Sequence, residues 1–157
     1  MILDLRNHDD VEIFVIGLDR RDGEVTGITS GCYDLLHHYH LLYFQRCRRL
    51  CDTLIVGVDC DDLVRQVKGK NRPIVPEHSR LAMVDALKPI QATFLMGSVD
   101  DFARAVQNFS ADIIFRNQEW MGREKEVAGA NLAKVVIIPD IPQVDSTSKI
   151  IEEIHKR

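Results

Sequence analysis

The sequence predicts an α/β protein: a Rossmann-like, doubly wound parallel sheet with helices on both faces, in a single domain spanning residues 1–157. Two observations support this prediction. Short apolar runs rich in strand-forming residues alternate along the chain with segments whose apolar residues recur at helical spacing. The run at residues 53–59, Thr-Leu-Ile-Val-Gly-Val-Asp, is almost continuously apolar. Such a run is typical of a strand that is buried on both faces of a parallel sheet.

The expected elements follow one another in the order that this fold requires. Extended runs at residues 11–17 and 25–30 are separated by a polar turn that ends in Gly23. A basic loop at residues 68–75 precedes a helix that begins at residue 76. Further strands are predicted at residues 53–59, 91–96, 112–116 and 134–138, and further helices at residues 38–51, 61–67, 100–109 and after Ser146.

Residues 1–24 lie outside the alternating pattern, and the sequence leaves two roles open for them. The Asp22-Gly23 turn would allow residues 11–17 to form an added edge strand, antiparallel to the strand at residues 25–30. Alternatively, this N-terminal extension would mediate contacts between two copies of the chain.

The charge and composition exclude several classes of protein. The formal net charge of −4 is unlike the basic surface of a dedicated nucleic-acid binder. No apolar run reaches the length of a membrane-spanning helix, and the acidic N-terminus does not resemble a signal peptide. We therefore expect no nucleic acid and no membrane among the partners, and a location in the cytoplasm.

The four cysteines do not show the paired spacing of zinc sites. Cys47 and Cys51 lie one helical turn apart on an apolar stripe, which favours buried free thiols. A metal site that combines them with His37, His38 and His40 is the less favoured alternative. Reduced cysteines agree with a cytoplasmic location.

The most informative segment is residues 31–40, Gly-Cys-Tyr-Asp-Leu-Leu-His-His-Tyr-His, which follows an extended apolar run. Gly31 lets the backbone approach an anion, and the start of a helix offers unpaired N–H groups at the positive end of its dipole. Asp34 can cap such a helix. His37 and His40, three residues apart, share one face of the first turn, so both can reach one phosphate chain. The segment therefore predicts a phosphate-binding pocket.

Five segments, taken in order, resemble the cytidylyltransferase-like nucleotidyltransferase superfamily, whose signature is His-x-Gly-His after the first strand. The resemblance covers residues 26–154. It is greatest to heptose-1-phosphate adenylyltransferases and to glycerol-3-phosphate and ethanolamine-phosphate cytidylyltransferases. The segments are residues 31–37, residues 52–58, Lys68-Gly69-x-x-Arg72-Pro73 with Arg80, residues 112–120, and Ser146-Thr147-Ser148-Lys149-Ile150.

The resemblance implies a reaction in which a phosphorylated small molecule attacks the α-phosphate of ATP or CTP and pyrophosphate is released. It implies His37, His40 and Lys68 as catalytic residues, with Mg²⁺ arriving on the nucleotide and no metal site built by the protein itself. Asp34 and Arg80 would bind the acceptor substrate, and a homodimer is the oligomeric state that the resemblance suggests. The implied nucleotide-binding residues are Gly31, Cys32, Tyr33, Arg72, Arg116, Glu119, Ser146, Thr147 and Ser148.

Three departures from the family pattern bear on activity. Tyr39 replaces the glycine of His-x-Gly-His, and its phenol must either point away from the nucleotide or fill the pocket. Asn117 and Gln118 replace small residues that let the backbone approach the base, and residues 141–145 lack the Arg-x-x-Gly-Ile pattern of cytidylyltransferases. The last departure favours ATP over CTP. Together they leave a second hypothesis open, a catalytically impaired nucleotide-binding or assembly protein of the same fold.

Overall fold

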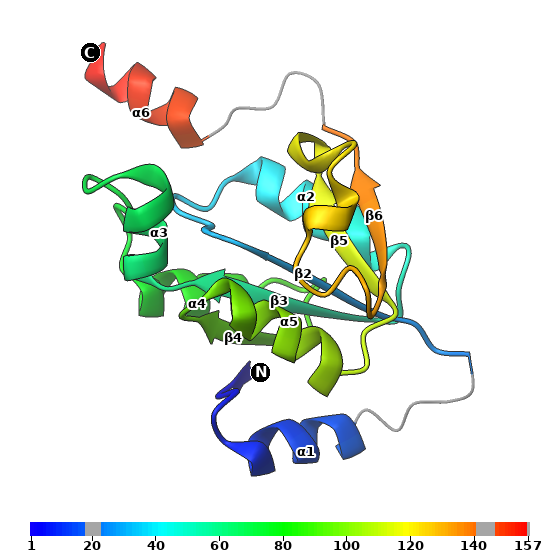
Figure 1. The fold of residues 1–157 in the computed structure, drawn as a ribbon. Coiled ribbons are helices and arrows are strands. Elements are labelled where there is room, and N and C mark those ends of the chain that lie inside the picture. Colours follow the sequence, from blue (N-terminus) through cyan, green and yellow to red (C-terminus); the bar gives the residue numbers. More distant parts are fainter. Residues whose placement is uncertain (18–22, 141–146, 157) are drawn as a thin grey trace.

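A computed structural model describes residues 1–17, 23–140 and 147–156. Within these residues the core is one six-stranded parallel sheet with the strand order β1-β4-β3-β2-β5-β6 (Figure 1). The predicted α/β fold is confirmed, and each strand expected from residue 25 onward lies within one residue of its expected bounds. The strands are β1 (Ile2–Leu3), β2 (Thr26–Gly31), β3 (Thr53–Asp59), β4 (Ala92–Met96), β5 (Ile113–Asn117) and β6 (Lys134–Ile138).

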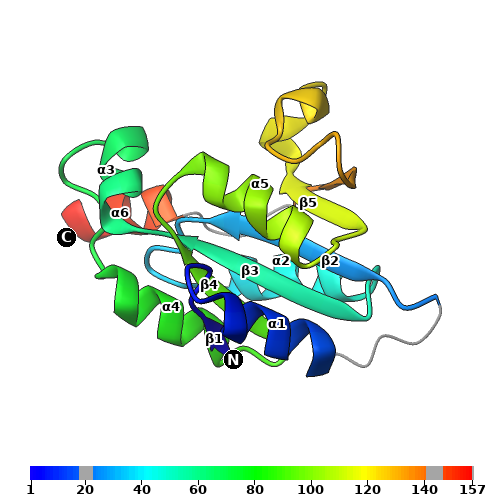
Figure 2. The ribbon, with the colours of Figure 1, turned by 60° about the horizontal axis from the view of Figure 1, so that its bottom comes forward.

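Helices of the described chain lie on both sides of this sheet (Figure 2). The α-helices are α1 (His8–Gly17), α2 (His38–Arg48), α3 (Asp61–Lys68), α4 (Glu77–Asp85), α5 (Val99–Asn108) and α6 (Thr147–His155). Two short 3₁₀ helices, η1 (Gln118–Trp120) and η2 (Glu124–Glu126), follow β5. No helix in the described ranges is both long enough and apolar enough to cross a membrane.

Two apolar clusters account for the packing, one on each face of the sheet. The first joins α1 and α5 to the sheet and the second joins α2 and α4 to it. Ile55 of β3 belongs to the first cluster, whereas its neighbours Leu54 and Val56 belong to the second. Successive side chains of a strand point to opposite faces, so a strand covered on both faces needs apolar residues at every position. This is why β3 reads as a continuous apolar run.

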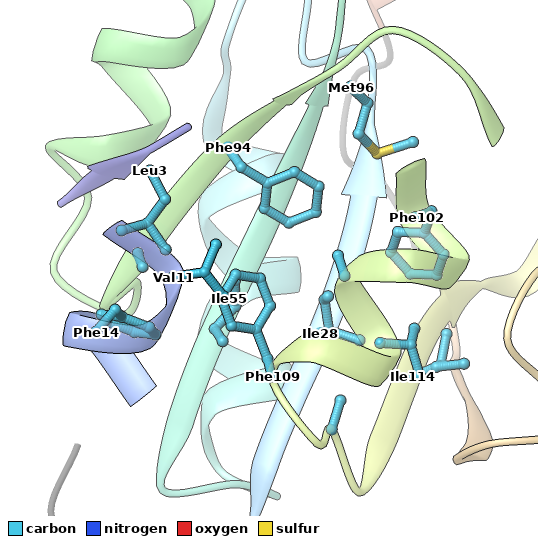
Figure 3. Packing of buried hydrophobic residues seen from close by; sticks show 14 of the residues in the cluster. Leu3, Val11, Phe14, Ile28, Ile55, Phe94, Met96, Phe102, Phe109 and Ile114 are labelled. Atoms are coloured by element: carbon cyan, nitrogen blue, oxygen red, sulfur yellow. The ribbon is translucent and has the colours of Figure 1, made fainter. Parts of the chain in front are cut away.

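The N-terminal segment contradicts the prediction. Residues 11–17 belong to helix α1, and β1 pairs in parallel with β4 at the edge of the sheet. The expected strand antiparallel to β2 is therefore wrong, because β2 lies between β3 and β5. Val11 and Phe14 are buried, and the Phe14 ring meets that of Phe109 edge to face with 5.8 Å between centroids (Figure 3). This packing selects a helix over the extended conformation that β-branched residues favour locally. Asp22 lies outside the described residues.

The strand order reverses direction at β2. The chain runs outward from β2 through β3 to β4 on one side, and β5 and β6 lie on the other side. In open α/β sheets, ligands bind beyond the carboxyl ends of the strands at such a reversal. Gly31 and Asn117, the last residues of β2 and β5, therefore mark where a site is expected.

Candidate active site

A cavity of about 480 Å³ opens at the carboxyl ends of β2, β3 and β5, where the strand order reverses. His37, Arg80 and Ser148 do not line it, and Ser146 lies outside the described residues. The structure thus brings most of the predicted residues, from well-separated segments, around one cavity. Those that line it are Gly31, Cys32, Tyr33, Asp34, His40, Lys68, Arg72, Arg116, Glu119 and Thr147.

The two histidines form the N-terminal cap of helix α2. His37 is the N-cap residue, and its Nδ1 accepts a hydrogen bond from the backbone N–H of Tyr39 at 3.3 Å. In return, Nδ1 of His40 accepts a bond from the backbone N–H of His37, also at 3.3 Å. The two ring centroids lie 4.1 Å apart. This reciprocal capping box holds both imidazoles at the positive end of the helix dipole.

The capping bonds determine which ring nitrogen of His40 carries its proton. Since Nδ1 accepts an N–H bond, we infer that the neutral imidazole is protonated at Nε2. Burial, followed by the nearby charges of His37 and Lys68, lowers the pKa of His40 to about 4. At neutral pH, His40 is therefore uncharged, and its Nε2–H is the donor that remains for a ligand in the cavity.

The lowered pKa of His40 makes stability depend on pH. Between the folded pKa of about 4 and the unfolded value of about 6.5, only the unfolded chain takes up a proton, so stability falls as pH falls through this window. We expect this group to remove about 2 kcal/mol of unfolding free energy between pH 7 and pH 5. Urea unfolding at both pH values checks it: His40→Gln should show a smaller loss than the wild type. Equal losses in the two proteins would contradict the lowered pKa.

Asp34 joins the loop after β2 to the basic loop at residues 68–75. Its Oδ2 accepts bonds from Nε of Arg72 at 2.7 Å and from the N–H of Ile74 at 2.9 Å, and its Oδ1 accepts from the N–H of Val75 at 2.9 Å. Burial alone would raise the pKa of this carboxyl, but these donors hold it below its usual range. The backbone oxygen of Asp34 also accepts a bond from Oγ1 of Thr147 at the start of α6. Asp34 therefore fixes the positions of three segments that line the cavity.

Arg80 lies behind the cavity rather than in it. Its side chain is 1% exposed. Nε donates to the backbone oxygen of Val75 at 2.8 Å, Nη2 pairs with Asp61 at 2.8 Å, and Nη1 donates to the backbone oxygen of Cys32. Because all three nitrogens are used within the protein, Arg80 is placed to hold the surrounding loops. It is not placed for the acceptor contact that the resemblance implied, and the side-chain oxygens of Asp34 are occupied in the same way.

The loop between β2 and α2 holds strained backbone on either side of Asp34. Tyr33 and Leu35 have φ values of +51° and +48°, in the left-handed region that non-glycine residues seldom adopt. The bonds to Asp34 and to the Cys32 carbonyl oppose relaxation of this loop. The same bonds therefore hold residues 32–34, which line the cavity and precede His40 in the chain, in place.

The phenol of Tyr39 is turned toward the end of β6. Its hydroxyl donates to Oδ1 of Asp140 at 2.9 Å, while its ring lines one side of the cavity. Burial, then the bond to Asp140 and the charge of Glu119, raises the pKa of Tyr39 to about 12, so the phenol stays protonated. The ring thus forms a side wall of the cavity rather than a plug between the two imidazoles.

We expect Tyr39→Gly to leave nucleotide affinity unchanged or weaker, because the ring already points toward Asp140. The variant should also lose about 1 kcal/mol of stability, the usual cost of glycine inside a helix. Calorimetric titration with ATP measures the affinity, and Tyr39→Phe serves as the control that keeps the ring but removes the hydroxyl. Clearly tighter binding by the glycine variant would show that the ring obstructs the nucleotide.

Arg116 and Trp120 form a further part of the cavity wall. The Arg116 guanidinium carbon lies 4.4 Å from the ring centroid of Phe102 and 5.4 Å from that of Trp120. Its Nη1 donates to Oγ of Ser30 at 2.9 Å. Trp120 and the exposed Glu119 both line the cavity. Trp120 therefore lines the cavity while it also packs against the first apolar cluster.

Sequence reasoning missed the part of the cavity that lies toward α3 and α5. Asp59, the last residue of β3, lines the cavity there. An aspartate at the end of a strongly apolar strand could have indicated a site residue, because the carboxyl ends of parallel strands lie at the same edge of the sheet. The apolar part of this wall comes from Leu63, Val67, Met96, Val99 and Phe102.

Cys47, in α2, and Cys51, which follows that helix, are buried free thiols, as favoured from the sequence. Burial raises the pKa of both, to about 11 for Cys51. In the described part of the chain, no group of three or more His, Cys, Asp or Glu side chains is arranged to hold a metal ion.

The chain is similar to several known proteins. The bifunctional protein HldE of Desulfatibacillum aliphaticivorans is 35% identical over 145 residues, which cover 87% of this chain and 28% of that protein. HldE of Helicobacter pylori strain J99 is 32% identical over 139 residues, covering 88% and 29%. Among solved structures, the chain resembles the lipopolysaccharide core biosynthesis protein from Thermoplasma volcanium GSS1, with a TM-score of 0.62 and 28% sequence identity. The match covers 76% of this chain and 98% of the other. The chain thus spans less than a third of the length of the two HldE relatives.

The fold is that of a Rossmann-like protein with a cavity at the start of its second helix. The sequence pattern described as Cytidylyltransferase-like matches residues 28–153. The chain therefore belongs to the cytidylyltransferase-like family of nucleotidyltransferases. The family predicted from the sequence is confirmed.

Proposed function

We propose that this chain transfers a nucleotidyl group, AMP in preference to CMP, from a nucleoside triphosphate to a phosphorylated sugar or polyol. The observation that carries the proposal is the position of His40. Its Nε2–H is left for a ligand at the N-terminus of α2, in a cavity that Lys68 and Arg72 also line. Oriented neutral donors, a helix terminus and two cations suit the stabilisation of charge on a reacting phosphate.

In the proposed reaction, an oxygen of the acceptor phosphate forms a bond to the α-phosphorus of the triphosphate. The bond between that phosphorus and the oxygen bridging to the β-phosphate breaks, and pyrophosphate leaves with the electron pair. Such a transfer depends on positioning and charge stabilisation and needs no covalent protein nucleophile. His40 would donate to the α-phosphate through Nε2, with His37 fixing the ring. Lys68 and Arg72 would offset the charge of the departing pyrophosphate.

Mg²⁺ bound to the triphosphate would supply further charge neutralisation. Magnesium usually takes most of its ligands from phosphates and water and only one or two from protein carboxylates. The cavity fits this requirement, because the exposed carboxylate of Glu119 lines it. Glu119 would therefore contact the ion or its water ligands.

The preference for AMP rests on the family resemblance. The basic loop, Lys68-Gly69-x-x-Arg72-Pro73, has the form of the heptose-1-phosphate adenylyltransferases, and the Arg-x-x-Gly-Ile pattern of cytidylyltransferases is absent at residues 141–145. The same resemblance to heptose-1-phosphate adenylyltransferases favours a phosphorylated sugar as the acceptor.

A second candidate is a nucleotide-binding protein of this fold that no longer catalyses transfer. The observation in its favour is the ring of Tyr39, which lines the cavity where the family pattern has glycine. Melting curves and pyrophosphate release, measured on the same preparation, separate the two candidates. The transferase proposal expects ATP to raise the melting temperature and pyrophosphate to appear with a phosphorylated sugar. A raised melting temperature with no pyrophosphate from any of a panel of sugar and polyol phosphates would favour the binding protein.

A further inference from the structure

Two charged side chains in the cavity have unused hydrogen-bonding capacity. The side chain of Asp59 makes no hydrogen bond and no ion pair within the described ranges, although the residue is partly buried at the end of β3. Nε of Arg116 is buried and has no hydrogen-bond partner among the described residues, since the guanidinium bonds only Ser30, through Nη1. Buried polar groups without partners are rare in folded proteins, and at the wall of a cavity they point to a ligand.

The surroundings of these two groups would strengthen bonds to such a ligand. Phe102 and Trp120 cover the Arg116 guanidinium, with ring centroids 4.4 and 5.4 Å from its central carbon. Burial lowers the pKa of Arg116 and raises that of Asp59, and each group partly offsets the shift of the other. They nevertheless form no ion pair with each other in the described structure. Each charge is therefore partly desolvated but has no partner in direct contact, which costs free energy. A ligand that forms hydrogen bonds with both groups would offset this desolvation cost.

The pair suits a ligand that carries one anionic group and several hydroxyls. A guanidinium offers a planar fork of donors that matches phosphate, whereas a carboxylate accepts bonds from hydroxyls and repels phosphate. A polyphosphate chain laid along this wall would meet the carboxylates of Asp59 and Glu126, which both line it. Lys68 and Arg72 are cations, and their charge suits a polyphosphate. The side-chain chemistry thus distinguishes residues suited to a triphosphate from a pair suited to a hydroxylated monophosphate.

Building on the proposed transferase function, we propose that Asp59 and Arg116 form the acceptor subsite, which takes a sugar or polyol monophosphate. Arg116 donates to the acceptor phosphate, and Asp59 accepts bonds from hydroxyls of its carbon chain. Arg116 lies beside the end of β2, so a phosphate bound to it lies near the start of α2. This moves Arg116 from the nucleotide, to which the family resemblance assigned it, to the acceptor.

Steady-state pyrophosphate release with ATP and mannose 1-phosphate or glycerol 3-phosphate tests the subsite. We expect Arg116→Gln to raise the acceptor KM at least tenfold while the ATP KM changes less than twofold, with Arg116→Lys in between. Asp59→Asn should also raise the acceptor KM, and leave the Mg²⁺ and ATP dependence unchanged. A defect confined to the ATP KM or to Mg²⁺ dependence would overturn the proposal.

Two control variants remove the same charges just outside the cavity. Arg123→Gln removes the other cation beside Trp120, whose guanidinium carbon lies 5.1 Å from that ring. Asp62→Asn removes an exposed carboxylate of α3 that pairs with Arg65. Both should keep the wild-type KM for either substrate. Equal acceptor defects in controls and subsite variants would overturn the proposal, and circular dichroism of each variant identifies misfolded protein.

A failure of the transferase function is distinguishable from a failure of the subsite. If the wild type releases no pyrophosphate with any acceptor, the transferase proposal fails, and calorimetric titration with mannose 1-phosphate then decides on the subsite. Binding that the controls keep and that Asp59→Asn and Arg116→Gln lose supports it. Absence of binding to the wild type, or equal binding to all variants, overturns it.

Discussion

His40→Ala is expected to reduce turnover roughly 1,000-fold while changing the KM for ATP only a few-fold. The imidazole is uncharged at neutral pH, so it should add little to ground-state binding of a triphosphate. The cations Lys68 and Arg72, which also line the cavity, are proposed to supply most of that binding. The Nε2–H of His40 gains most when charge builds on the α-phosphate in the transition state. The loss should therefore fall on kcat.

Initial rates of pyrophosphate release at saturating acceptor give both constants for this variant. His38→Ala is the matched control, since His38 is the exposed imidazole between the two capping histidines and does not line the cavity. It should retain near-normal turnover. Near-normal turnover in His40→Ala as well would remove that imidazole from the mechanism.

Asp34→Ala is expected to lower the free energy of unfolding by about 3 to 5 kcal/mol and to abolish measurable transfer. The carboxylate is 2% exposed and ties Arg72 and two backbone N–H groups together. Its removal leaves a partly buried guanidinium and two donors without partners. It also frees the strained loop that leads to His37.

Denaturant unfolding of Asp34→Ala and Asp101→Ala compares two aspartates with similar partners. Asp101 also accepts bonds from two backbone N–H groups, those of Gly97 and Ser98, and pairs with Arg104, but it caps α5 outside the cavity. Its loss should cost about 1 kcal/mol, as helix caps usually do. Equal costs for the two variants would show that Asp34 is an ordinary surface cap.

The location of the site was predictable because it depends on local patterns. Two histidines three residues apart at a helix start must share a face, and the order of strands and helices implies a parallel sheet with one reversal. His40, Lys68 and Arg72 accordingly line one cavity. The histidine pair and the sheet need only sequence spacing and the handedness of βαβ units, whereas Lys68 and Arg72 were assigned to the site by the family resemblance.

The roles of Arg80 and Asp59 were not predictable in the same way. The three bonding partners of Arg80 lie 5, 19 and 48 residues away along the chain, so only the folded chain shows that its nitrogens are used internally. The proposed role of Asp59 depends on its sharing a cavity with Arg116 of β5, and β3 and β5 lie on opposite sides of β2. Helix α1 was missed for a related reason, since contacts with Phe109 outweigh the strand preference of residues 11–17.

The central claim is that the cavity at the start of α2 transfers a nucleotidyl group to an acceptor phosphate. A ³¹P NMR spectrum of the protein with Mg²⁺, ATP and a sugar monophosphate tests it most directly. The account predicts pyrophosphate together with the two coupled resonances of a new sugar–nucleotide diphosphate. A spectrum that shows bound but unreacted ATP, or only ADP and orthophosphate, with every sugar and polyol phosphate tried, would contradict it.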